Sequence, residues 1–159
     1  MAKKDITMTE SERLEFLSAP RTLIVTTVDG RGYPHVTPMW YVVDDGKVVF
    51  RSFTKSQKIV NLRRNPKVGV LVEEGHAYQD LRGVMIQGQA TLVDDPEFVL
   101  DLYARLAARY AFAGAEPIAF PDRASLEAAF GRFAPKNTAV VIDPVRITSW
   151  DHRKLAGTY

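Results

Sequence analysis

The strongest constraint on the fold is a series of strand-like runs separated only by short turns. The first three runs are rich in β-branched and aromatic side chains and cover residues 22–28, 35–43 and 47–53. Such side chains favour strands. Asp45-Gly46 is a tight hairpin signal between the second and third runs. Pro38 predicts a bend or bulge in the second run, because proline cannot donate a hydrogen bond to a central ladder.

Three further runs continue this pattern after residue 66. They cover residues 67–73, 84–93 and 139–150, the last with an interruption at Asp143-Pro144. Six strands joined mostly by hairpins lack the regular strand–helix alternation of a doubly wound sheet. The sequence therefore predicts a mainly β (α+β) fold, a small mixed or antiparallel six-stranded barrel with peripheral helices.

Capping signals predict where the peripheral helices begin. Thr9 and Glu12 have the spacing of a capping box. They open an amphipathic helix whose apolar side carries Leu14, Phe16 and Leu17. A second helix is capped by Asp94 or Asp95, with Pro96 in its first turn. A third helix is expected over residues 124–133, after a loop that contains glycine and proline.

Length, charge and cysteine content exclude several classes of protein. We expect one domain over residues 1–159, with residues 1–8 as a flexible tail. A net charge of +2 is too small to indicate a nucleic-acid partner, and the absence of cysteine excludes disulfides, thiolate metal sites and a cysteine nucleophile. No apolar run approaches the roughly 20 residues of a membrane span, and the N-terminus lacks an apolar signal core. A soluble, cytoplasmic protein is expected.

A polar turn and a short basic helix follow the third run, within residues 51–66. Thr54 and Gln57 have capping-box spacing, and Ser56 is a rival N-cap. Pro66 disfavours helical geometry at Asn65, so the helix is expected to stop there.

The start of this helix has the composition of a phosphate site. A helix N-terminus presents unpaired N–H groups and the positive end of its dipole, which attract anions. Lys55 and Lys58 add two ammonium groups beside it. The alternative is a solvent-exposed basic face, with Arg63 and Arg64 complementing the helix C-terminus.

Several other residues leave two interpretations open. Arg51 is either a helper in anion binding or a surface cross-strand charge. One of Trp40 and Tyr41 is expected to face inward; core packing is the commoner role of such aromatic residues, and a wall for a ligand is the alternative. The three histidines are scattered at positions 35, 76 and 152. Because none has metal-ligand spacing, we predict no metal site. The sequence offers no convincing nucleophile–base pair, so no catalytic side chain is assigned.

Taken together, residues 17–150 resemble the pyridoxamine 5'-phosphate oxidase-like split-barrel superfamily of flavin and deazaflavin binders. The segments that carry the resemblance are residues 29–34, 37–41, 51–53, 56–58, 61–66 and 84–88. The resemblance implies an FMN-binding type of split barrel and a homodimer that holds the cofactor ring between its subunits. It also implies that Ser52, Ser56, Gln57 and Lys58 bind the cofactor phosphate. Because an anionic tail needs cations, Arg51, Lys55 and Arg64 are further candidates to help bind it through charge-assisted hydrogen bonds. The backbone of Val36, Thr37, Pro38 and Met39 is similar to the edge that hydrogen-bonds the ring.

Three positions differ from the true pyridoxamine phosphate oxidases. Val36 replaces a phosphate-binding arginine, Tyr41 a lysine and Gly83 a flavin-contacting glutamine. Oxidation of vitamin B6 is therefore not expected. The run at residues 61–66 is more similar to the branch that binds the deazaflavin coenzyme F420.

These similarities imply an oxidoreductase that binds coenzyme F420 and transfers a hydride to a small unsaturated or aromatic acceptor. The alternatives are an FMN-dependent oxidoreductase of the same fold and a non-catalytic flavin- or F420-binding protein. A nucleic-acid-binding or regulatory barrel is a third class, which the small net charge disfavours.

Overall fold

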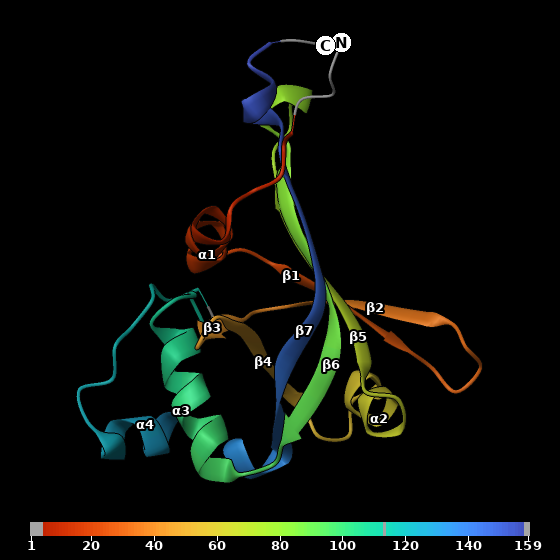
Figure 1. Ribbon diagram of the computed structural model, residues 1–159. Helices are drawn as coiled ribbons and strands as arrows, with labels where there is room; N and C mark the ends of the chain where they lie inside the picture. Colours follow the sequence, from red (N-terminus) through yellow and green to blue (C-terminus); the bar gives the residue numbers. More distant parts are fainter. Residues whose placement is uncertain (1–4, 113, 158–159) are drawn as a thin grey trace.

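The computed structural model describes residues 5–112 and 114–157, and its core is one curled antiparallel sheet (Figure 1). The strands of this part of the chain are β1 (Leu23–Val28), β2 (Pro34–Met39), β3 (Val42–Asp44), β4 (Lys47–Phe53), β5 (Lys67–Glu74), β6 (Arg82–Val93) and β7 (Asn137–Asp151). They pair in the order β2-β1-β5-β6-β7-β4-β3. The predicted mainly β barrel with peripheral helices is confirmed, with one strand more than the six expected.

The additional strand arises because the predicted run at residues 35–43 divides in two. β2 and β3 lie at opposite edges of the sheet, yet only Trp40 and Tyr41 separate them along the chain. The chain therefore crosses the opening of the barrel at these two residues, which is possible only because the sheet curls. Tyr41 is fully buried there, and its hydroxyl donates to the Leu17 carbonyl at 2.9 Å.

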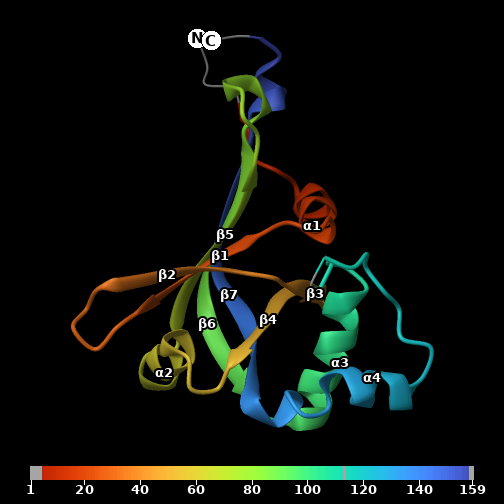
Figure 2. The same cartoon turned by 180° about the vertical axis from the view of Figure 1, so that it is seen from behind.

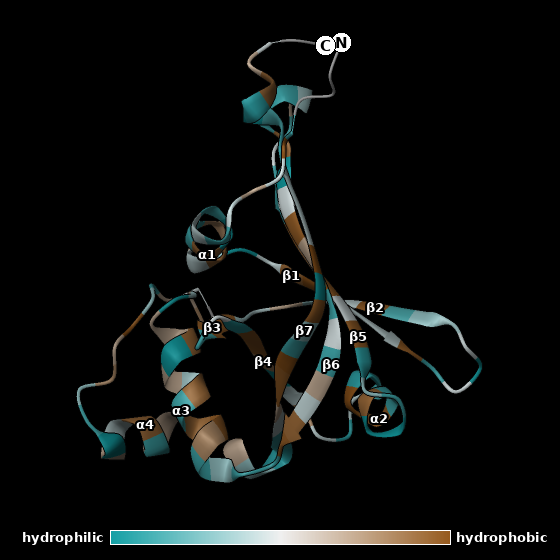
Figure 3. Cartoon of the chain, viewed as in Figure 1, coloured by the Kyte–Doolittle hydropathy of each residue, from teal (hydrophilic) through white to brown (hydrophobic). Residues whose placement is uncertain are grey.

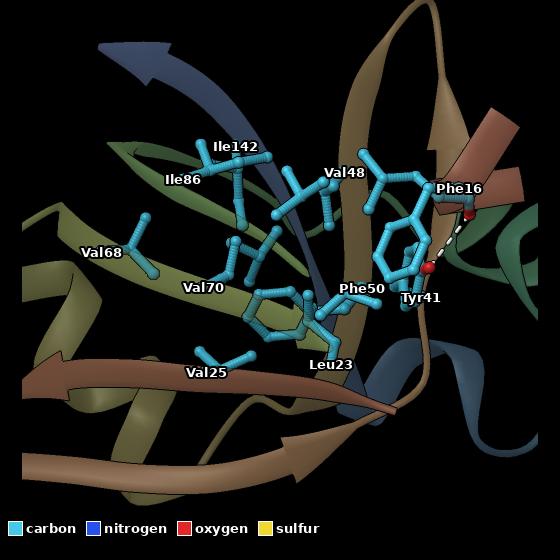
Figure 4. Close-up of a cluster of buried hydrophobic side chains, with 14 of the residues drawn as sticks. Phe16, Leu23, Val25, Tyr41, Val48, Phe50, Val68, Val70, Ile86 and Ile142 are labelled. Carbon is cyan, nitrogen blue, oxygen red and sulfur yellow. Dashed lines mark hydrogen bonds between the residues drawn. The ribbon is translucent and has the colours of Figure 1, made fainter. Parts of the chain in front are cut away.

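Two hydrophobic clusters lie on the two faces of the curled sheet. The first fills the barrel with side chains from β1, β4, β5, β6, β7 and α1 (Figure 4). The second lies between the outer side of β4 and β7 and the helices α3 and α4, whose inward sides are hydrophobic (Figure 3). β4 contributes to both because its side chains alternate: Val48 and Phe50 point into the barrel, and Val49 points toward α3.

Three of the four α-helices in the described part of the chain begin at a residue whose side chain caps them. The bounds of the helices are α1 (Glu10–Ser18), α2 (Gln57–Arg64), α3 (Pro96–Ala107) and α4 (Arg123–Phe130), with short 3-10 helices η1 (Tyr78–Asp80), η2 (Ala134–Lys136) and η3 (His152–Leu155). The capping box of Thr9 and Glu12 is confirmed. Asp95, not Asp94, caps α3. The expected position of Leu14 on the buried side of α1 is wrong: its side chain is 41% exposed, whereas Phe16 and Leu17 are buried.

β7 is continuous through Asp143-Pro144, where an interruption was expected. The ladder with β6 shifts its register between Gln87 and Gly88, and this places one extra residue, Val145, in β7. The bulge accommodates the proline without ending the strand. β5, β6 and β7 then extend as an arm that carries η1 and η3 (Figure 1).

Residues 5–8, part of the predicted tail, run beside the end of β7. Met8 is buried, and its N–H donates to Ser149 Oγ at 3.1 Å. The Asp151 N–H donates to the Ile6 carbonyl at 2.8 Å. These contacts hold residues 5–8 against the sheet; residues 1–4 lie outside the described residues.

No helix within residues 5–112 and 114–157 is long and apolar enough to cross a membrane.

Candidate functional site

The end of β4 and the start of α2 bring three polar side chains together. Lys58 Nζ donates to Ser52 Oγ at 3.2 Å, and Ser52 Oγ lies 3.0 Å from Ser56 Oγ. Ser52 is 5% exposed, whereas Ser56 and Lys58 are half-buried. The structure thus gathers three of the four predicted phosphate ligands at one corner, beneath the β1–β2 hairpin (Figure 2).

Ser56 is the N-cap residue of α2, and its hydroxyl does not cap the helix. The expected capping box of Thr54 and Gln57 is therefore wrong: Thr54 instead places its hydroxyl 3.0 Å from that of Thr138. In the described structure the N–H groups of the first turn therefore have no side-chain cap and remain available at the N-terminus of α2. An anion at this corner would meet these N–H groups as well as the ammonium group.

The charge of Lys58 is not neutralised by a carboxylate. Within the described part of the chain its Nζ bonds only to Ser52. Burial lowers the pKa of Lys58, and no acidic neighbour opposes this shift. A half-buried ammonium group without an anionic partner is poorly solvated, so an incoming anion gains more from it than from an exposed lysine.

The other predicted polar residues of this segment hold α2 in place. Gln57 Nε2 donates to Asn61 Oδ1 at 2.8 Å, and the buried Asn61 donates to Thr27 Oγ1 at 3.0 Å. Arg64 donates to the Val28 carbonyl at 2.9 Å, at the far end of the helix. Gln57 and Arg64 therefore do not join the corner, and Lys55 is exposed beside it.

The predicted ring-binding edge is an edge of the sheet. β2, which contains Val36, Thr37, Pro38 and Met39, pairs only with β1 among the described strands. One side of its backbone is therefore open to a ligand. The Val36 side chain is 57% exposed, and the buried Thr37 Oγ1 has no hydrogen-bond partner in the described structure.

Arg51 is separated from the corner because it leaves the opposite face of β4 from Ser52. Its Nη1 donates to Asn137 Oδ1 at 2.9 Å, and its guanidinium carbon lies 3.9 Å from the centre of the Tyr103 ring. Burial lowers its pKa. A pocket of about 390 Å³ opens beside it, lined by Thr22, Pro38, Met39, Trp40, Arg51 and Leu106. The structure thus groups Arg51 with Pro38 and Met39 rather than with Lys58.

An aromatic cluster (Trp40, Tyr103, Tyr110, Phe112, Phe130) stands behind this pocket. The ring of Trp40 stacks on that of Tyr110, with centroids 4.9 Å apart and 4° between the planes. Phe112 meets Trp40 edge-on, also at 4.9 Å. Trp40 is 37% exposed and Tyr41 is buried, so the expectation that one of the two faces inward is confirmed. Tyr103, Tyr110 and Asn137 have no local sequence signal of a site, because they lie 50 or more residues from Trp40 or Arg51 along the chain.

Two of the three departures from the oxidase pattern, Tyr41 and Gly83, lie in surroundings that suit their present residues. Burial raises the pKa of Tyr41 to about 12, and its hydroxyl is bonded within the core. Gly83 pairs with Trp150 across the sheet, and a Cβ there would lie 2.9 Å from two indole carbons and closer to a third. A glutamine therefore does not fit at position 83.

Gly83→Ala should destabilise the fold by roughly 1–3 kcal/mol, because the added methyl group forces the Trp150 ring to move. Gly69→Ala is the matched control: Gly69 also lies in a strand, and its Cβ would make an ordinary 3.9 Å contact with Thr26. Urea unfolding of both variants measures the difference. Equal stabilities would contradict the packing of Trp150 on Gly83.

The described histidines make no metal site. His152 Nδ1 contacts the Tyr78 carbonyl at 2.7 Å, and across residues 5–112 and 114–157 no three His, Asp or Glu side chains gather as metal ligands.

Comparison with known proteins identifies the family. Residues 9–150 match the family description "Pyridoxamine 5'-phosphate oxidase". A conserved hypothetical protein, Rv2991 from Mycobacterium tuberculosis, is 36% identical with a TM-score of 0.85, over 100% of this chain and 94% of that one. An F420 reductase is 25% identical with a TM-score of 0.64, over 84% and 93%.

A FAD-binding protein from Mesorhizobium loti shares the fold at 18% identity and a TM-score of 0.62, over 90% and 94% of the two chains. Comparison with curated proteins gives no match. The family match spans most of the sequence and agrees with the curled antiparallel sheet: the chain belongs to the pyridoxamine 5'-phosphate oxidase family of split-barrel proteins.

Proposed function

We propose that this protein is an oxidoreductase that binds coenzyme F420 and transfers a hydride to a small unsaturated or aromatic acceptor. The observation that carries the proposal is the corner of Ser52, Ser56 and Lys58, where a half-buried ammonium group has no carboxylate partner among the described residues. Similarity to an F420 reductase supports the choice of F420 over FMN.

The residues at this corner suit a cofactor phosphate. A phosphate accepts hydrogen bonds from an ammonium group, hydroxyl groups and helix N–H groups, and all three kinds of donor are present. The open edge of β2 suits the carbonyl and N–H groups at the rim of a flavin or deazaflavin ring. Ser52, Ser56 and Lys58 would hold the tail, and the backbone of residues 36–39 the ring.

A bound deazaflavin or flavin ring supplies the hydride, and solvent supplies the accompanying proton. The chain then has to bind, orient and shield the reactants rather than provide a nucleophile. Trp40 and Met39 line the adjoining pocket with apolar surface.

Cofactor titration tests this proposal. F420 and FMN are each added to the purified protein while cofactor fluorescence is followed, and reduced cofactor is then offered to a panel of acceptors. We expect F420 to bind with the higher affinity and to be reoxidised by at least one acceptor. Binding without turnover on any acceptor would favour the non-catalytic binder, and binding of neither cofactor would refute the proposal.

A homodimer is part of the proposal, and the outer face of the sheet supports it. One uncharged row of side chains crosses four paired strands: Val36 on β2, Thr26 on β1, Gly69 on β5 and Gln87 on β6. A depression of about 330 Å³ lies over this row and is bordered by Val145, which is 74% exposed. Because Val36 begins the predicted ring edge, a second copy on this face would also border the ring.

Val145→Arg should convert the dimer to a monomer, because an arginine at the border of this depression cannot be buried in an interface without an anionic partner. Cofactor affinity should fall in parallel. Ile118→Arg is the matched control, an exposed apolar residue in the loop before α4. Light scattering gives the mass of each variant. A Val145→Arg protein that stays dimeric would exclude this face as the interface.

A further inference from the structure

The pocket beside Arg51 is a second site, separate from the Ser52–Ser56–Lys58 corner. Successive side chains of a strand point to opposite faces, so Ser52 faces Lys58 while Arg51 faces α3. A single phosphate cannot reach both cations. At about 390 Å³ the pocket stands at the small end of ligand sites. It has room for a one-ring compound and not for a whole cofactor.

The guanidinium of Arg51 is incompletely satisfied within the described structure. Nη1 donates to Asn137 and the Tyr103 ring lies under the cation, yet the buried Nε has no acceptor and no contact supplies one for Nη2. No carboxylate of the described residues pairs with it. A buried cation without an anion is costly, and a planar guanidinium is shaped to bind a carboxylate with two parallel hydrogen bonds.

Apart from Thr22, the remaining lining of the pocket is apolar. Pro38, Met39, Trp40 and Leu106 surround the space next to the arginine, and the stack of Trp40 on Tyr110 fixes the orientation of the indole. Such a lining favours binding of a planar, apolar ring system, and it makes few hydrogen bonds to a polar sugar and few ordered contacts with a flexible chain.

We propose that this pocket binds the hydride acceptor, and that the acceptor is a small aromatic or unsaturated carboxylate. Its carboxylate lies on Arg51 and its planar body against Trp40 and Met39. The proposal rests on the proposed function for the role of acceptor, because Pro38 and Met39 belong both to the pocket and to the predicted ring edge. Arg51 is thus a specificity residue for the acceptor rather than a ligand of the cofactor phosphate.

Benzoate is the probe that tests the pocket, with benzamide as its uncharged analogue. Calorimetric titration of the full-length protein, without cofactor and then with F420, measures both. We expect benzoate to bind, and benzamide to bind at least roughly tenfold more weakly. Only the carboxylate can supply both the negative charge and the hydrogen-bond acceptors that the guanidinium lacks. Arg51→Met should lose benzoate binding by a similar factor, and Arg51→Lys should retain part of it.

Arg105→Met is the matched control, an exposed arginine on α3 outside the pocket lining. If Arg51→Met does not fold, Thr22→Trp is the variant to test. Thr22 is exposed and lines the pocket, so the larger ring should block benzoate by filling the space. Normal benzoate binding by either variant overturns the proposal, as does equal binding of benzoate and benzamide.

Cofactor titration of the same variants separates this proposal from the proposed function. Arg51→Met should bind F420 like the wild type, and a parallel loss of F420 and benzoate would overturn the assignment of Arg51 to the acceptor. A wild-type protein that binds benzoate but neither F420 nor FMN would refute the cofactor proposal and leave the carboxylate pocket standing.

Discussion

Lys58→Ala is expected to bind coenzyme F420 roughly 10- to 150-fold more weakly than the wild type. This range corresponds to the loss of one hydrogen bond to a charged partner, about 1.5–3 kcal/mol. The effect should be at the upper end because the lysine is half-buried and its charge has no carboxylate partner in the described structure. Fluorescence titration of the two proteins gives the ratio of dissociation constants.

Lys55→Ala is the matched control for this experiment. Lys55 precedes the same helix but is exposed, so its loss should change the affinity by less than about threefold. Ser52→Ala should fall between the two, because it removes a neutral hydroxyl from the corner. Unchanged affinity in Lys58→Ala, with a melting temperature equal to that of the wild type, would place the cofactor tail elsewhere.

Arg109→Ala is expected to destabilise the protein by about 2–4 kcal/mol, the largest effect on folding that we predict for a single charged side chain. Its guanidinium donates to the carbonyls of Leu17, Ser18 and Ala19 at 2.6–2.7 Å, where α1 ends. It also lies over the Tyr41 ring at 4.6 Å. Removing it takes a donor from each of three helix-terminal carbonyls, of which, in the described part of the chain, only Leu17 and Ala19 keep a side-chain donor, the shared Tyr41 hydroxyl. It also breaks the link between the end of α1 and the segment that follows α3.

Arg105→Ala provides the comparison, since Arg105 lies one turn earlier on α3 and is exposed. It donates to the Val43 carbonyl at 2.8 Å and pairs with Asp44 at 3.4 Å. An exposed ion pair of this kind contributes about 1 kcal/mol or less, so Arg105→Ala should destabilise the protein less than Arg109→Ala. Urea unfolding of both variants, with Arg109→Lys as the conservative change, measures the difference. A loss in Arg109→Ala no greater than that in Arg105→Ala would show that the link between α1 and the segment that follows α3 is dispensable.

The strands and helix starts were predictable where the signal is local. The bounds 47–53 of β4 and the end of α2 before Pro66 follow from turn and proline chemistry in neighbouring residues. The break at Trp40 was not predictable in this way, because the curl of a seven-stranded sheet determines where the chain must cross between edges. The passage of β7 through Pro144 likewise depends on a register shift in β6.

The same distinction between local signals and long-range packing applies to the residues of the candidate site. The grouping of Ser52 with Lys58 follows from a strand end beside a helix start, which the sequence displays. Alternation along β4 also places Arg51 and Ser52 on opposite faces, but it does not reveal what covers each face. Tyr103 and Asn137, which hold Arg51, come from 52 and 86 residues further along the chain, and only the packing of α3 and β7 brings them there.

Trp40 and Tyr41, the two residues that connect β2 to β3, differ in how well they tolerate substitution. Tyr41 is fully buried and its hydroxyl donates a hydrogen bond to the Leu17 carbonyl. Substitutions at position 41 therefore disturb the closure of the barrel. Trp40 borders the pocket, partly exposed, and the backbone pairing of the strands does not depend on its side chain. Position 40 is therefore where the ligand preference of the proposed acceptor pocket can change, in evolution or by engineering, while the fold stays intact.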